Sequence, residues 1–115
     1  MVAAPAEQEV AALKIKSALI NPAGTDAGRE TITLLNPGSQ DISLEGWLIR
    51  NQVNRVQPLS GTISAHSERT IPMDSSKIML TNKGGTLVLI SAAGEEVDKV
   101  TYTKSSVKSG VQNVF

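Results

Sequence analysis

The sequence contains no cysteine among its 115 residues. Disulfide frameworks and thiol catalysis are therefore excluded, and a metal site would lack the commonest soft ligand. There is one histidine, His66, so a Ser-His-Asp triad would have to use it. It lies in the polar segment 64–67, which is typical of a turn. We expect an exposed histidine without a catalytic role, and no zinc site, no cofactor and no enzymatic activity.

Aromatic residues are also scarce, and the net charge is zero. Aromatics make up 3% of the chain, as Trp47, Tyr102 and Phe115. The core must therefore be built from Leu, Ile and Val, and the β-branched members of this set favour sheets. Eleven basic residues balance eleven acidic ones, which gives no indication of a strongly charged partner surface. A chain of this length is expected to form one domain with a single core.

Long hydrophobic segments are missing as well. The longest apolar runs, such as residues 87–90, are far too short to span a bilayer. The first five residues lack the basic and apolar regions of a signal peptide, and the compartment stays open. We expect residues 1–12 to be a flexible linker and residues 13–115 to form the domain, in a chain cut from a larger protein.

What the sequence does have is short alternating segments separated by turn formers. Leu13 and Ile15 alternate with lysines, and residues 29–35 place Ile32 and Leu34 on one face. Gly, Pro and Asn clusters interrupt such segments about every 8–12 residues. No amphipathic helix is indicated. The pattern predicts an all-β antiparallel sandwich of eight to nine short strands.

The predicted core centres on the only tryptophan. Gly46 allows the backbone to bend beside the Trp47 ring, and we expect Trp47 and Ile49 to face inward together. A Trp in this setting is a packing residue more often than a ligand-stacking one. The expected core comprises Ile32, Leu34, Trp47, Ile49, Leu80, Leu87, Leu89, Val100 and Tyr102.

Three further segments are predicted from turn chemistry. Residues 51–57 are expected to form a polar loop, and Pro72 indicates an edge strand or the end of one. Residues 78–80 and 86–90 are expected to form a hairpin around a glycine-assisted loop. Its Asn82-Lys83-Gly84-Gly85 sequence lacks the glycine spacing, the Lys-Ser/Thr pair and the helix of a phosphate-binding loop.

A calcium site is the one metal alternative. Asp26 and Glu30, with Asn21 nearby, place oxygen ligands on one loop. Their spacing does not match the EF-hand, and Asp and Asn also stabilise turns by bonding to their own backbone. We favour the turn role and keep Asp26 and Glu30 as calcium candidates.

Several motifs together resemble the lamin tail domain, with the opening motif closest to bacterial members. The resemblance covers about residues 13–103, and each motif is short. The opening motif is Asn21-Pro22-x-Gly24-x-Asp26-x-Gly28-x-Glu30; the later ones are Leu44-x-Gly46-Trp47, Leu59-Ser60-Gly61-Thr62-Ile63, Leu80-Thr81-Asn82-Lys83-Gly84-Gly85-Thr86-Leu87 and Val97-Asp98-x-Val100-Thr101-Tyr102.

The resemblance implies an immunoglobulin-like β-sandwich without the disulfide, used as a non-catalytic interaction or accessory module. In animals, members of the family form the C-terminal domain of nuclear filament proteins and contact proteins and nucleic acid. Bacterial relatives are joined to hydrolase or nuclease domains. No coiled-coil heptads are present, so the filament role does not carry over. We expect a protein partner, bound through loops or a free sheet edge, and leave the oligomeric state open. The alternative is a nucleic-acid-binding accessory domain attached to a nuclease or hydrolase, for which Lys14, Lys16, Lys104 and Lys108 are the candidate basic residues.

Overall fold

The computed structural model describes residues 13–19, 30–74, 78, 84–103 and 113–115. These residues form strands and turns, and none of them lies in a helix. The strands are β1 (Lys14–Leu19), β2 (Thr31–Asn36), β3 (Ile42–Ser43), β4 (Leu48–Asn51), β5 (Val56–Pro58), β6 (Thr62–Ile63), β7 (Ser67–Pro72), β8 (Gly84–Ile90), β9 (Glu96–Thr103) and β10 (Asn113–Val114).

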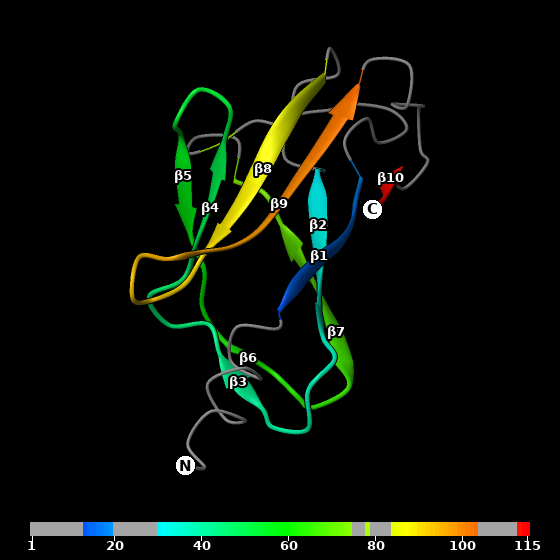
Figure 1. Ribbon diagram of the computed structural model, residues 1–115, viewed down its shortest axis with the longest axis vertical. Coiled ribbons are helices and arrows are strands. Elements are labelled where there is room, and N and C mark those ends of the chain that lie inside the picture. The colour runs from blue at the N-terminus through cyan, green and yellow to red at the C-terminus, as the bar shows by residue number, and fades with distance from the viewer. Residues whose placement is uncertain (1–12, 20–29, 75–77, 79–83, 104–112) are drawn as a thin grey trace.

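The strands form two four-stranded antiparallel sheets and one small two-stranded sheet (Figure 1). One large sheet has the order β10-β1-β2-β7 and the other the order β5-β4-β8-β9. The β3–β6 pair lies at one end of the molecule, beyond the large sheets (Figure 1). The predicted all-β immunoglobulin-like sandwich is confirmed. The described residues between Lys14 and Thr103 form nine strands, and β10 adds two further paired residues.

The alternation in the sequence determines which face of each strand is buried. In β1, Ile15 is buried while Lys14 and Lys16 are exposed. In β2, Ile32 and Leu34 are fully buried, and Asn36 continues the same face. Thr33, on the opposite face, is also buried, and its hydroxyl is satisfied by a hydrogen bond with that of Thr70 on β7 at 2.9 Å.

The hydrophobic core fills the space between the two large sheets. Most of the residues expected there are buried, and Val100 is partly buried against them. Leu80 lies outside the described residues. Residues of the expected set that are buried in the cluster are Ile32, Leu34, Trp47, Ile49, Leu87, Leu89 and Tyr102.

A tight turn delivers Trp47 into this core. The Trp47 N–H donates to Leu44 O at 3.0 Å, which closes a four-residue turn. Gly46 has a φ of +84° at its third position, a conformation that glycine adopts without strain. A Cβ at Gly46 would also lie 3.0 Å from the Ala92 Cβ of the β8–β9 turn. Gly46 thus allows both the turn that precedes Trp47 and the close approach of the β8–β9 turn at Ala92.

Two expectations about loops are wrong in part. Residues 51–57 were expected to be a polar loop, but β5 begins at Val56 and contains Gln57. Gln57 is buried because its amide bonds to the backbone at both Pro72 and Asp74. Gly84 and Gly85 were expected in the loop of a hairpin, but they lie within β8, where they pair with Thr103 and Tyr102 of β9. Residues 79–83 lie outside the described part of the chain.

Within the part of the chain that the structure describes, no helix is long and apolar enough to cross a lipid bilayer.

Candidate functional site

The histidine considered for catalysis lies on the surface. His66 is exposed in the turn before β7, with a φ of 55° and its N–H donating to Gly38 O at 3.0 Å. Among the residues described, no group of three or more His, Cys, Asp or Glu side chains is arranged to hold a metal ion. His66 therefore occupies the exposed turn position expected from the sequence.

Only one of the two calcium candidates lies in the described part of the structure. Asp26 lies outside the described residues. Glu30 is 3% exposed just before β2, and its carbonyl oxygen accepts a hydrogen bond from Met73 N at 2.8 Å. The calcium site stays a prediction.

The lysines considered for nucleic acid are only partly available. Lys14 and Lys16 are exposed on β1, but Lys16 forms an ion pair with Glu68 of β7. Lys104 and Lys108 lie outside the described residues. Trp47, considered for ligand stacking, is 3% exposed and so presents no face to a ligand.

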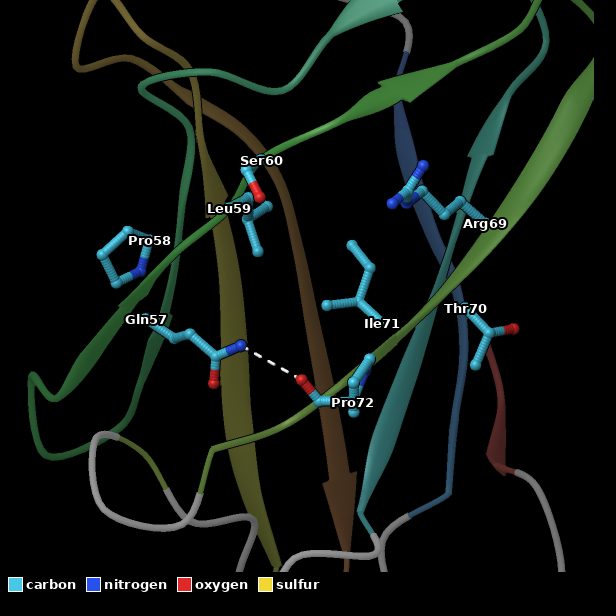
Figure 2. A pocket seen from close by; sticks show the side chains of 8 residues that line it. All are labelled: Gln57, Pro58, Leu59, Ser60, Arg69, Thr70, Ile71 and Pro72. Carbon is cyan, nitrogen blue, oxygen red and sulfur yellow. Dashed lines mark hydrogen bonds between the residues drawn. The ribbon is translucent and has the colours of Figure 1, made fainter.

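The most informative surface feature is a hollow of about 250 Å³ between the β5–β6 segment and β7. Figure 2 shows Leu59 and Ser60 on one side of it and the β7 side chains on the other. This surface is called the β7 groove below. Its lining residues are Gln57, Pro58, Leu59, Ser60, Arg69, Thr70, Ile71 and Pro72.

Gln57 closes one end of the β7 groove. Its Nε2 donates to Pro72 O at 3.1 Å (Figure 2), and its Oε1 accepts from Asp74 N at 2.7 Å. Both the nitrogen and the oxygen of this buried side-chain amide therefore have hydrogen-bond partners. Since β5 and β7 are edge strands of different sheets, Gln57 ties the two sheets together on this side of the sandwich.

Arg69 marks the other end of the groove. Its Nη1 donates to Thr62 O at 3.2 Å. The guanidinium lies over Gly61, where a Cβ would come within 2.8 Å of Nη2. Gly61, which has a φ of +89°, thus leaves room for the arginine head. Arg69 makes no ion pair with any residue that the structure describes, and the nearby Glu45 carboxylate accepts from Gly61 N instead.

The backbone of β7 has a free edge along the groove. Met73 N bonds to Glu30 O, and in an antiparallel pair the residues that bond to the neighbouring strand alternate. The backbone groups of Ile71, Arg69 and Ser67 therefore point toward β2. The N–H and C=O groups of Glu68 and Thr70 therefore point away from β2. Pro72 also points outward, but it has no N–H and its carbonyl is taken by Gln57.

The other long edge strand, β9, is better protected. It contains a register shift opposite Leu89 and Ile90, and it carries Lys99. Asp98 Oδ2 accepts a hydrogen bond from Ile15 N of β1 at 2.8 Å, which connects this edge to the other sheet. Bulges, lysines and covering contacts are the means by which proteins block edge pairing. Within the described residues, β7 has no register shift and no lysine, and the outward N–H groups of Glu68 and Thr70 have no hydrogen-bond partner.

Pro72 indicates an edge strand or a strand end from the sequence, and it lies at the end of the edge strand β7. The roles of Gln57 and Arg69 are not indicated by the sequence. Gln57, between Val56 and Pro58, has no periodic pattern that predicts a strand. The signal for Arg69 was the alternation of Arg69, Ile71 and Met73, which places a charged side chain on the inward face of a strand.

A second hollow of about 250 Å³ lies on the outer face of β4, β8 and β9. The register places Arg50, Val88 and Lys99 in one row across these strands. Neither cation forms an ion pair with any residue in the described ranges. The hollow is lined by Arg50, Asn51, Gln52, Asn54, Thr86, Val88 and Lys99.

Comparison with protein families gives a match to the Lamin Tail Domain model over residues 6–104. A search of the curated proteins found no match to this chain. The Lamin Tail Domain is a family of immunoglobulin-like, non-enzymatic interaction modules, and the match spans most of the sequence. On the strength of that match and of the antiparallel sandwich, the chain belongs to the lamin tail domain family.

Proposed function

We propose that this lamin tail domain is a non-catalytic interaction module that binds an extended segment of a protein partner along the free edge of β7. The observation that supports it is the outward direction of the backbone groups of Glu68 and Thr70, beside the β7 groove. An added strand would exchange both hydrogen bonds with Thr70 and continue toward Glu68. Main-chain pairing of this kind supplies affinity, and neighbouring hollows supply specificity.

The open edge is short because Gln57 and Pro72 block its end. An incoming strand can use the N–H of Thr70 and of Glu68, but it finds no donor at Pro72. Pairing over so few residues favours a reversible contact. An accessory module that tethers other proteins or domains needs contacts of this kind.

The test uses a proline at the edge. The whole 115-residue chain would serve as target for a displayed library of random nine-residue peptides. Selected peptides would then be measured against Thr70→Pro and Thr70→Val by calorimetry. Both variants lose the hydroxyl that pairs with Thr33, but only proline removes the outward N–H. Because that N–H does not pair with β2, we expect Thr70→Pro to fold.

We expect Thr70→Val to bind the selected peptides like the natural chain and Thr70→Pro to lose binding. Melting temperatures of the two variants serve as the folding control. Equal binding by both variants, or a library that yields no peptide sensitive to Thr70→Pro, would contradict the proposal.

The outer face of β4, β8 and β9 favours a second candidate function, which is nucleic-acid binding. Arg50 and Lys99 flank one hollow without a described carboxylate partner, and phosphate contacts need such free cations. Fluorescence anisotropy with a single-stranded oligonucleotide at low salt tests it. Binding that falls in Arg50→Glu and Lys99→Glu would support this function, whereas a flat titration of the natural chain would remove it.

A further inference from the structure

We infer that the segment bound at β7 runs antiparallel to it and carries an apolar residue followed two positions later by Asp or Glu. This inference rests on the proposed function and specifies the chemistry of the partner. It is carried by the arrangement of Arg69 and Ile71 on the inward face of β7, at the β7 groove.

We expect an acidic residue in the partner because of how the Arg69 side chain is held. Its head is held over Gly61 by the bond from Nη1 to Thr62 O, so the guanidinium is oriented before any partner arrives. It is exposed and has no ion pair with a described residue. A guanidinium has five N–H donors in a planar fork that fits a carboxylate. A carboxylate opposite Arg69 is therefore the complementary group.

We expect an apolar residue in the partner because apolar side chains line the middle of the β7 groove. Figure 2 shows the Ile71 side chain between β7 and the Leu59 segment. Ile71 is partly buried against the core, and Leu59 is buried within it. Pro58 and Pro72 border the same hollow. An apolar side chain placed there would cover the exposed part of Ile71.

The spacing of two follows from strand geometry. A segment paired with Thr70 has its neighbouring residues directly opposite Ile71 and Arg69, with their side chains on the inward face. In the antiparallel direction the residue opposite Ile71 comes first. Antiparallel pairing matches every other pair in this sheet. The parallel direction would reverse the order, so the order itself reports the direction of binding.

The test selects the random nine-residue library separately on the natural chain, Arg69→Gln and Arg69→Glu. On the natural chain we expect enrichment of peptides with an apolar residue two positions before Asp or Glu. On Arg69→Glu we expect Lys or Arg at that position, with the apolar position kept. Replacing the acidic residue by its amide in one selected peptide should weaken binding to the natural chain about tenfold, the size of one charge-assisted bond. The same replacement should change binding to Arg69→Gln by less than about twofold, because no charged partner is left.

The outcomes separate the two proposals. If peptides bind and Thr70→Pro abolishes binding, but the same sequences are selected on all three targets, the partner chemistry is wrong and edge binding stands. Enrichment of the reversed order overturns the antiparallel direction. If no peptide depends on the Thr70 N–H, the proposed function itself fails. Melting temperatures of Arg69→Gln and Arg69→Glu establish that each target is folded.

Discussion

Trp47 is the residue on which the packing of the two sheets depends most. Its ring is 3% exposed, and its backbone lies between the turn that begins at Leu44 and the pairing with Leu59. Replacing Trp47 by Ala should lower the free energy of unfolding by about 3–5 kcal/mol, because it leaves a cavity in the core. Urea denaturation measures this, with Trp47→Phe as a milder control. A loss below about 1 kcal/mol would place the ring on the surface.

Asn36 joins the end of β2 to the strand β6 through its side chain. Its Nδ2 donates to Gln40 O, Ile63 O and Ser64 O at 2.7, 3.1 and 3.2 Å. Its Oδ1 accepts from Gly38 N at 3.1 Å. The side chain is fully buried, so an apolar replacement would leave these groups without partners.

We therefore expect Asn36→Ala to destabilise the fold by about 3 kcal/mol. Gln40→Ala is the matched control, since that side chain is exposed in the same turn. Chemical denaturation of the two variants gives the comparison. Similar stabilities for both would show that the Asn36 network contributes little.

At the scale of elements, the turn before β4 combines two constraints on one glycine. Gly46 and Gly94 have φ values of +84° and +85°, so alanine should strain both turns by about 1 kcal/mol or more. Only at Gly46 would the new Cβ also meet the Ala92 Cβ, whereas nothing lies within 4 Å at Gly94. Thermal unfolding should therefore show a larger loss for Gly46→Ala than for Gly94→Ala. Equal losses would mean that the Ala92 contact relaxes freely.

The edge of β9 is held to β1 by one carboxylate. Asp98 Oδ2 accepts from Ile15 N, and Asp98 Oδ1 accepts from Lys99 N at 2.8 Å. Asp98→Ala should cost about 1–3 kcal/mol and speed hydrogen exchange at the Ile15 amide, because that N–H loses its acceptor. Asp98→Asn keeps one acceptor oxygen and should have a smaller effect. An unchanged exchange rate at Ile15 in Asp98→Ala would contradict this role.

Strand positions with a regular pattern were predictable, and those fixed by distant partners were not. The alternation of Leu13, Ile15, Ile32 and Leu34 specifies buried faces locally, as the structure has them. Gln57 lies in β5 because its backbone pairs with Ile49, and its side-chain amide bonds to residues 15 and 17 positions away. Asp98 finds Ile15 at a separation of 83 positions. No local pattern reports contacts of that range.

At the scale of the whole molecule, side chains connect the two large sheets at both sides of the sandwich. Gln57 bonds from β5 to the end of β7, and Asp98 bonds from β9 to β1. Both bonds occupy backbone groups at sheet edges, which reduces unwanted pairing. The outward backbone groups of Glu68 and Thr70 lie beyond the reach of Gln57 and have no such bond to any residue that the structure describes. The proposed binding site is therefore the edge of β7, because the edge of β9 is tied to β1 and the edge of β7 at Thr70 is not.

The candidate site was therefore predictable only in outline. A free sheet edge was expected as one means of binding, and Pro72 indicated which segment forms an edge. The β7 groove itself depends on Arg69 lying over Gly61 and on Gln57 reaching Pro72. These contacts join segments from different strands, so their geometry needs the assembled sandwich.

The most direct test measures amide hydrogen exchange by NMR in the whole chain, with and without a saturating peptide selected on it. We predict that the exposed N–H groups of Thr70 and Glu68 exchange quickly in the free protein and become protected when the peptide binds. The amides that already face β2, such as Arg69 and Ile71, should change little. Unchanged exchange at Thr70 and Glu68, with protection appearing on another face, would contradict binding at the β7 edge.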